Sequence, residues 1–413
     1  MSQKNVAIIG AGIIGTACAY ELRRDGHEVT LYDRSEPGAE ASFGNSGVLS
    51  PSAVVPISMP GLARRIPKWL LDPNGPLYLD WKHLPRLVPW LVRFERAGRA
   101  DRVPAISAAL STLNRETVDL LRTMLRDARL EHLIEKKGVL NVFRSAREFD
   151  EERFATELRR RAGAHIDELD AGELRDLEPS LSPVFTRGLF FPESAHSLNP
   201  YRVVTGLAED FEHRGGKFVR AEVRGVRQVS PGRTALVTDR GSAEFDNIVI
   251  AAGVWSNQLI APIGYRVPLE TQRGYHVTIA DPGVALNTVV VPVAHMITIV
   301  PMEMGVRIAG TVEFAGLRKP PDPRRAAALL RNGLATIPTL QLGGTTTWMG
   351  HRPCTPDSLP VLGPAPRDPA LLFAFGHGHQ GLLGSAKTAK IIANLVAGRK
   401  PDIDLRPFSA DRF

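Results

Sequence analysis

The chain has 413 residues, of which 43% are hydrophobic and 23% charged, and its formal net charge is +7. This length exceeds one typical domain, so we expect two domains or one large composite fold. The positive charges are spread along the chain without a basic stripe or a recognisable nucleic-acid-binding module, and we therefore expect no nucleic-acid partner.

Residues 5–34 carry the strongest local signal, because their pattern predicts a strand, a glycine turn, a helix and a second strand. Gly10, Gly12 and Gly15 form a G-x-G-x-x-G motif directly after the first strand. The first glycine permits the turn, the second lets backbone approach a pyrophosphate, and the third lets helix and strand pack closely. Asp33 ends the second strand at the distance from the motif where an acid accepts ribose hydroxyls. The pattern predicts a dinucleotide site.

The segment 38–51 follows this motif and is rich in small residues, among them Ser42, Asn45 and Ser46. Such a loop can surround a second phosphate and pass beneath a flat ring, which favours FAD over NAD. The alternative interpretation is a flexible connector.

The segment 52–100 is irregular and contains Trp69, Trp81 and Trp90 among prolines and basic residues. One interpretation is an interfacial patch, over 60–95, that contacts a membrane or an electron acceptor. We favour the other, a pair of short helices packed on the core, because proline interrupts a long amphipathic face.

The middle of the chain predicts alternating helices and strands. We expect helices over 104–127, 147–163 and 200–214, and strands over 138–143, 217–229, 234–239 and 247–251. The turn after the last of these strands places Ala252 and Gly253 at the carboxyl end of a parallel strand, against the nucleotide.

From 265 to 314 the pattern becomes alternating and turn-separated, as expected of a second, antiparallel sheet. A helix over 322–335 follows, and then the segment 350–363, GHRPCTPDSLPVLG, whose prolines and glycines predict stiff, turning chain. Arg352 in this segment is either a solvated surface arginine or a cation held for a partner. The residues 371–398 again predict strand, glycine turn and helix, so the chain leaves the nucleotide domain and returns to it.

Five motifs, VAIIGAGIIG, SFGNSG, VIAAGVWS, HRPCTPDSLPVLG and GHGHQGLLG, occur in the order found in one flavoprotein family. From Val6 to about Gly398 the chain resembles the FAD-dependent D-amino-acid oxidase superfamily, and most of all its D-amino-acid dehydrogenase branch, which includes hydroxyproline dehydrogenases. The first motif is common to many flavoproteins, whereas the Arg-Pro segment with its downstream Gly-His is more specific.

The resemblance implies an α/β fold in which a Rossmann-like FAD-binding domain is interleaved with an antiparallel-sheet substrate domain. The FAD-binding domain is expected to comprise 1–50, part of 140–260 and 345–413, and the substrate or cap domain part of 51–139 together with 261–344.

The resemblance also implies the residues of the site. Arg352 falls on the arginine that binds the substrate carboxylate, which suits a bidentate guanidinium. Tyr275 and His276 lie where relatives place active-site groups, although alternating strand residues also serve packing. The residues that would hold FAD, with Val223 binding adenine through its backbone, are Gly10, Ala11, Gly12, Ile14, Gly15, Asp33, Arg34, Ser42, Asn45, Ser46, Gly47, Val223, Ala252, Gly253, Gly378, His379, Gln380, Gly381 and Leu382.

The chain has two cysteines, Cys18 and Cys354, which form neither a disulfide framework nor a metal-ligand spacing, and we expect no metal. Cys354 lies downstream of the position where some relatives attach flavin, so we expect noncovalent FAD. The chain starts directly with a predicted strand and has no stretch of about 18 apolar residues, which favours a cytoplasmic protein, with a peripheral position at the inner membrane as the alternative.

The activity implied is FAD-dependent dehydrogenation of a D-amino acid, or of a cyclic imino acid such as D-hydroxyproline or D-proline. The substrate becomes an imine by hydride transfer to flavin N5, and the electrons pass on to an acceptor such as a quinone. The alternatives are a glycine- or sarcosine-type FAD oxidase that produces peroxide, and a noncatalytic flavoprotein subunit of a larger dehydrogenase.

Overall fold

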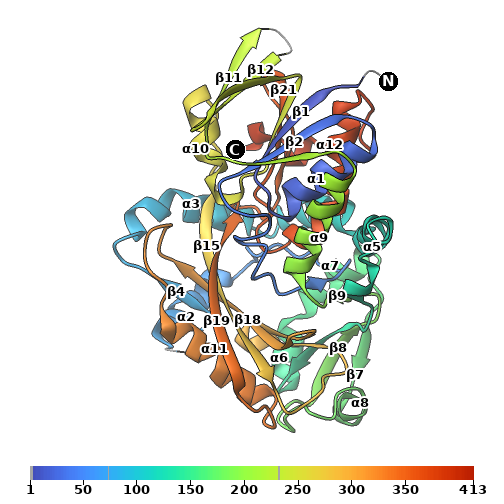
Figure 1. The fold of residues 1–413 in the computed structure, drawn as a ribbon. Helices are drawn as coiled ribbons and strands as arrows, with labels where there is room; N and C mark the ends of the chain where they lie inside the picture. The colour runs from blue at the N-terminus through green and yellow to red at the C-terminus, as the bar shows by residue number, and fades with distance from the viewer. Residues whose placement is uncertain (1–2, 73, 231–232) are drawn as a thin grey trace.

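The computed structural model describes residues 3–72, 74–230 and 233–413. Residues 1, 2, 73, 231 and 232, which fall within the predicted domain ranges, lie outside the described residues. The strands of the described chain form two large sheets and two small ones, which helices cover (Figure 1).

The first large sheet is built from short apolar strands that are buried on both faces, as is typical of parallel sheets. Its neighbouring strands run parallel except for β20, which is antiparallel to β21. β1 is followed along the chain by β2 on one side and has β14 on its other side, so the carboxyl ends of β1 and β14 border a crevice. The spatial order is β10 (Lys217–Arg220), β2 (Glu28–Asp33), β1 (Asn5–Ile9), β14 (Asn247–Ile250), β21 (Asp368–Phe375) and β20 (Val361–Ala365).

Helix α1 (Ile13–Arg24) packs tightly beneath this crevice, together with α12 (Gly381–Val396) and α9 (Pro200–His213). A Cβ atom at Gly15 would overlap the carbonyl oxygen of Gly10, so only glycine lets the helix approach the preceding turn this closely. Gly10 itself has a φ of 106°, which is accessible to glycine and rarely to other residues.

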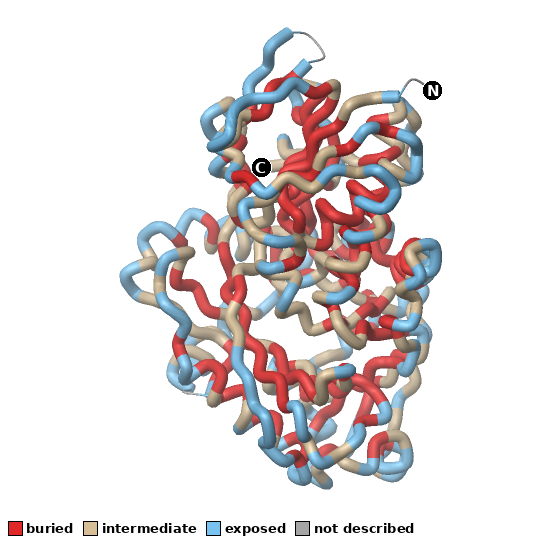
Figure 2. The backbone as a smooth tube through the Cα atoms, viewed as in Figure 1, coloured by how far each residue is buried: buried red, intermediate tan, exposed pale blue. Residues whose placement is uncertain are grey.

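The second large sheet lies below the first in Figure 1, and the long strands β15 and β19 connect the two regions. Alternating residues of its strands meet helix α11 (Pro323–Thr336), and Figure 2 shows the resulting core as a buried layer. The order is β19 (Gly343–Cys354), β15 (Glu270–Asp281), β18 (Gly305–Phe314), β17 (Ile297–Met302), β16 (Val289–Pro292), β6 (Val139–Phe143), β8 (Arg187–Phe191) and β7 (Asp167–Leu169), with β4 (Leu77–Leu79) beside β18.

The remaining elements complete the two regions. The small sheets are β11 (Val223–Ser230), β12 (Arg233–Thr238) and β13 (Gly241–Phe245), and β3 (Val48–Leu49), β9 (Ala195–Ser197) and β5 (Ile134–Glu135). The other helices are α2 (Ile66–Leu71), α3 (Leu84–Ala97), α4 (Val103–Asn114), α5 (Thr117–Asp127), α6 (Ala146–Glu151), α7 (Arg153–Arg161), α8 (Ala171–Leu177) and α10 (Ser256–Ile260). Within the described ranges, no helix combines the length and apolarity needed to cross a membrane.

The helix predicted over 104–127 is in fact two helices, α4 and α5. Periodicity did not reveal the break, because both helices bury leucines toward the same core. The break lies between two buried polar side chains that bond to other segments: the Asn114 amide donates to the carbonyl of Ala53, and the Thr117 hydroxyl donates to the carbonyl of Leu383.

Two further expectations were wrong in detail. The helix predicted over 147–163 is split into α6 and α7, and the strand predicted over 217–229 is split into β10 and β11, which belong to different sheets. The described part of the segment 52–100 contains two helices, α2 and α3, as favoured, and α3 buries Leu87 and Trp90. Helix α3 continues through Pro89, because packing of its buried face compensates the backbone hydrogen bond that proline cannot make.

The first part of the 350–363 segment is a strand rather than a turning loop, and Arg352 lies within β19. The pairing of β19 with β15 over its whole length supplies the backbone hydrogen bonds that local sequence could not predict.

A buried charge network joins β15, β18 and α11. Arg273 and Glu313 are both 0% exposed, and the Arg273 Nη1 atom lies 3.4 Å from the Glu313 Oε2 atom. The Tyr275 hydroxyl donates to Glu313 at 2.5 Å and accepts from the N–H of Asp322 at 2.9 Å. Burying such a pair is costly, and removing only one partner leaves an uncompensated charge in the core.

Replacing Glu313 alone by leucine should therefore lower the free energy of unfolding by about 3–5 kcal/mol. The double variant Arg273→Met/Glu313→Leu should recover most of that loss, because neither charge then remains. Chemical denaturation followed by circular dichroism measures the free energy of unfolding of each variant. An equal decrease in the single and the double variant would contradict the pairing of Arg273 with Glu313.

Candidate active site

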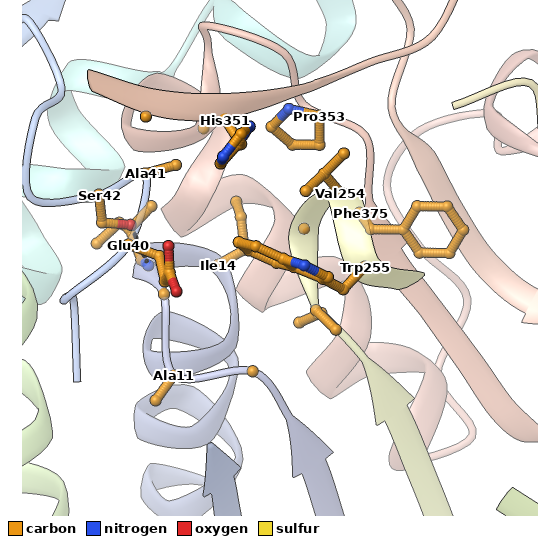
Figure 3. A pocket seen from close by; sticks show the side chains of 18 of the residues that line it. Ala11, Ile14, Glu40, Ala41, Ser42, Val254, Trp255, His351, Pro353 and Phe375 are labelled. Carbon is orange, nitrogen blue, oxygen red and sulfur yellow. Dashed lines mark hydrogen bonds between the residues drawn. The ribbon is translucent and has the colours of Figure 1, made fainter. Parts of the chain in front are cut away.

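A cleft lies at the carboxyl ends of β1 and β14 and extends to β15 and β19 of the second sheet. It leaves about 1890 Å³ of space between protein atoms, part of which is open to solvent. The residues that line the cleft run from the glycine turn after β1 to Arg352 of β19, so both large sheets contribute to it. Figure 3 shows residues that line it: Ala11 at the bottom of the view, Ile14 in the middle, Ser42 on the loop at the left, and His351 above the Trp255 indole.

Asp33 closes the glycine turn at the edge of this cleft. Its Oδ2 atom accepts from the N–H of Ala11 at 2.7 Å, and its Oδ1 atom accepts from the N–H of Ser35 at 2.9 Å. Burial raises the pKa of the Asp33 carboxyl, and these two hydrogen bonds act in the opposite direction. Each carboxylate oxygen has a further lone pair, so the side chain can still accept from a ligand hydroxyl.

The turn and the start of α1 fit a pyrophosphate. The Ser42 Oγ atom accepts from the N–H of Ile13 at 2.9 Å, which leaves the hydroxyl hydrogen for another acceptor. Gly12 lines the cleft without a side chain, and a Cβ at Gly253 would meet no atom within 4 Å. Helix α12 also begins at the cleft, so the positive ends of two helices lie along it. On this geometry the residues fit a dinucleotide cofactor.

Two residues of the second sheet hold the 43–45 loop. The Arg307 guanidinium donates to the carbonyl of Asn45 at 2.7 Å, and burial lowers its pKa to about 10. His276 Nδ1 lies 3.2 Å from the carbonyl oxygen of Gly44, which requires the proton to be on that nitrogen. Burial, followed by the charge of Arg307, lowers the pKa of His276 to about 3, so this imidazole is neutral at pH 7.

Arg352 is half-buried and lines the cleft. Its Nη1 and Nη2 atoms donate to the carbonyls of Thr311 and Gly310, at 2.8 and 3.3 Å. Burial lowers the pKa of the guanidinium. Of the acidic side chains in the described chain, none forms an ion pair with it. A guanidinium has five N–H donors, so three remain for a ligand.

An irregularity of β18 positions Arg352. β18 carries one extra residue between its pairings Arg273–Glu313 and Tyr275–Gly310. At this bulge Thr311 has a φ of 56°, which is unusual for a β-branched residue, and its carbonyl accepts from Arg352.

Tyr275 and His276 are adjacent on β15, so their side chains lie on opposite faces. The Tyr275 hydroxyl is engaged in the buried network with Glu313 and does not contribute a free group to the cleft, although Tyr275 forms part of the cleft wall. The His276 ring stacks on Trp348, with 5.2 Å between ring centroids, and does not line the cleft.

The structure brings most of the predicted cofactor residues to the cleft. Those that line it are Gly10, Ala11, Gly12, Ile14, Asp33, Arg34, Ser42, Asn45, Ser46, Val223, Ala252, Gly253, Gly378, His379, Gly381 and Leu382. Gly15, Gly47 and Gln380 do not line it. Gly15 serves helix packing, a Cβ at Gly47 would lie 2.8 Å from the carbonyl oxygen of Ser197, and the Gln380 amide donates to Ala53 at 3.1 Å.

Several cleft residues were not predicted, notably Gly274, Trp348, His351 and Trp255. A Cβ at Gly274 would overlap the guanidinium carbon of Arg352, so Gly274 provides the space that the arginine occupies. An isolated glycine within a strand pattern is the signal that could have indicated this close approach. Trp255 and His351 lie within two of the five motifs, VIAAGVWS and HRPCTPDSLPVLG. Trp348 carries no such signal, because only strand pairing and loop packing bring it to the cleft.

The histidines of the cleft are neutral at pH 7. Burial, followed by the charge of Arg352, lowers the pKa of His379 to about 4. His379 is an exposed residue that lines the cleft, and desolvation by the surrounding protein atoms is the main cause of its lowered pKa. Burial, then Arg273 and Arg34, lowers the pKa of His351 to about 4. Nowhere in the described residues do three His, Cys, Asp or Glu side chains gather as metal ligands would.

Comparison with known proteins gives a consistent result. The FAD dependent oxidoreductase family matches residues 5–395. A D-amino-acid oxidase of Bradyrhizobium diazoefficiens is 39% identical over 99% of both chains, and a D-amino acid dehydrogenase of Xanthobacter autotrophicus is 32% identical over 99% of both. The crystal structure of a glycine oxidase from Geobacillus kaustophilus, at 23% identity, superimposes with a TM-score of 0.76 and covers 100% of both chains.

These matches confirm the predicted fold class, the family resemblance and FAD as the cofactor. With nearly the whole chain matched, this protein belongs to the FAD dependent oxidoreductase family.

Proposed function

We propose that this enzyme oxidises a D-amino acid, or a cyclic imino acid such as D-hydroxyproline or D-proline, to the corresponding imine. When bound, FAD accepts the hydride that leaves the substrate α-carbon. The observation that carries the proposal is Arg352, a desolvated cation in the cleft with spare donors and, among the described residues, no acidic partner.

A planar carboxylate suits these spare donors. Two hydrogen bonds to backbone carbonyls fix the guanidinium plane, and a bidentate carboxylate can take two of the three donors that remain. An anion at this position also offsets the cost of keeping the cation half-buried. Amino and imino acids carry such a carboxylate next to the carbon that is oxidised.

The residues proposed to hold FAD are those of the glycine turn, Asp33, Ser42 and the start of α12, all of which line the cleft. We propose that attachment is noncovalent. Burial raises the pKa of the Cys354 thiol to about 12, and neither Cys354 nor Cys18 lines the cleft. Neither thiol is therefore available as a nucleophilic thiolate.

Replacing Arg352 by alanine should lower kcat/KM for the amino acid by about 150-fold, which corresponds to about 3 kcal/mol for a lost charge-assisted contact. Arg352→Lys keeps the charge but loses the bidentate geometry, and should recover only part of the loss. Steady-state kinetics with flavin content measured on each preparation is the test. The control is Arg406→Ala, at a side chain that is 91% exposed, and its kcat/KM should equal that of the parent. An unchanged kcat/KM in Arg352→Ala would contradict the proposal that Arg352 binds the substrate carboxylate.

The pH dependence should follow the substrate rather than the cleft histidines. The cleft is lined by His351, His377 and His379. Burial lowers their pKa values to about 4, about 3 and about 4, so these histidines stay neutral throughout pH 6–9. The uncharged amine is the reactive form, so kcat/KM should rise with pH as the substrate amine loses its proton.

Profiles of kcat/KM against pH for two substrates with different amine pKa values test this. The midpoint should move with the substrate and stay in place in His379→Gln. A midpoint that shifts in His379→Gln would show instead that this histidine titrates during the reaction.

We propose further that the electrons pass to an acceptor such as a quinone rather than to oxygen. Helix α3 packs on the core through Leu87 and Trp90, but other residues of the segment 60–95 remain exposed. Leu71 is 85% and Trp81 68% exposed, near the exposed basic side chains of Lys68 and Lys82, and this combination supports a peripheral contact with the inner membrane. The relatives include proteins named as oxidases and as dehydrogenases, so both outcomes have precedent.

Turnover in air should therefore yield little peroxide, whereas an added dye or quinone should restore rapid flavin reoxidation. Stopped-flow measurement of reoxidation with each acceptor separates the two. Stoichiometric peroxide at the full turnover rate would identify an oxidase. Failure of every amino or imino acid to reduce the flavin under anaerobic conditions would favour a noncatalytic subunit.

A further inference from the structure

Beside Arg352 the surface of the cleft is formed by two glycines that pair across neighbouring strands. Gly274 of β15 lies opposite Gly350 of β19, and on either side of them the pairs are Gln272 with Arg352 and His276 with Trp348. Side chains of paired and alternate residues share one face of a sheet. Arg352 and Trp348 therefore project from the same face, two residues on either side of the bare backbone of Gly350.

Both side chains fold over these glycines. A Cβ at Gly274 would overlap the Arg352 guanidinium, and a Cβ at Gly350 would overlap the Trp348 indole. Opposite residues of an antiparallel pair have Cα atoms about 4.5–5.5 Å apart. The indole and the guanidinium are therefore neighbours above one floor, and both line the cleft.

The Trp348 indole is fixed in this position from its other sides. Its ring is stacked on neutral His276 with 19° between the ring planes, and it lies 6.0 Å from the ring of Phe43. A Cβ at Gly44 would also overlap the indole, so the loop passes closely along it. A side chain packed this way is a rigid wall, because moving it would disrupt both the stack and the loop.

We infer that Trp348 is the specificity-determining wall of the substrate pocket, and that it restricts the enzyme to amino or imino acids with compact side chains. This inference rests on the proposed function, in which Arg352 binds the substrate carboxylate. With the carboxylate held over Gly274, the α-carbon and its substituent lie beside the indole. A short aliphatic chain or a five-membered ring fits that space, and an aromatic side chain meets the indole.

The test compares the ratio of kcat/KM for D-phenylalanine to that for D-alanine in the parent, Trp348→Ala and Trp348→Phe. The parent should prefer D-alanine, and the ratio should rise about tenfold or more in Trp348→Ala, within the range that pocket size supplies. Trp348→Phe keeps an aromatic ring against His276 and should give an intermediate ratio, which preserves the test if the alanine variant folds poorly.

The matched control is Trp255→Phe, which trims an indole at the nucleotide side of the same cleft, where it lies 4.4 Å beneath the Arg34 guanidinium. It should leave the selectivity ratio unchanged. Flavin content and melting temperature are measured for every variant to show that it is folded and holds FAD. The ratio of kcat/KM for the two substrates, measured on one preparation, does not depend on the fraction of active enzyme.

Three results would overturn the inference. The first is a parent enzyme that oxidises D-alanine and D-phenylalanine equally well, and the second is an unchanged kcat/KM ratio in active Trp348 variants. The third is an equal loss of activity with both substrates together with loss of FAD, which would mean that Trp348 only supports the 43–45 loop. Binding of acetate and benzoate to the oxidised holoenzyme, followed by flavin absorbance, applies the same size test without turnover. Failure of the proposed function shows separately, as parent-like kinetics in Arg352→Ala.

Discussion

Arg352 carries a charge into a half-buried cleft where, among the described residues, only two backbone carbonyls accept its hydrogen bonds. Several features of the second sheet follow from that requirement. The extra residue of β18 and the left-handed backbone of Thr311 present the carbonyls, and the missing side chain of Gly274 leaves space for the guanidinium. The strained backbone of Thr311 and the unpaired charge of Arg352 therefore occur at the same place. Such costly features are typical of binding sites and are rare in hydrophobic cores.

The same sheet also holds the cofactor side of the cleft. Arg307 and His276 bind the backbone of the 43–45 loop, and this loop continues into Ser42, which contacts the start of α1. The neutrality of His276 follows from burial and from the adjacent Arg307. Because the two regions share these contacts, the geometry of the nucleotide loop depends on residues more than 230 positions away in the chain.

The local sequence predicted best where neighbours along the chain define the structure. The glycine turn, the acid at position 33 and the helix that follows all lie within the first few dozen residues, and the structure has them as one strand–turn–helix–strand unit. Prediction was weaker where long-range contacts decide. The break between α4 and α5 depends on partners at Ala53 and Leu383, and the strand that contains Arg352 depends on β15.

The sequence by itself determined the dinucleotide fingerprint, the α/β class and the family, because these reside in short motifs and in the order of elements. Only the tertiary structure decided which side chains face the cleft. Strand register assigned Tyr275 to a buried network, and it placed Trp348 beside Arg352 across a glycine pair. The reason is that a one-residue change of register reverses every side chain of a strand, and register is defined by pairing between distant segments.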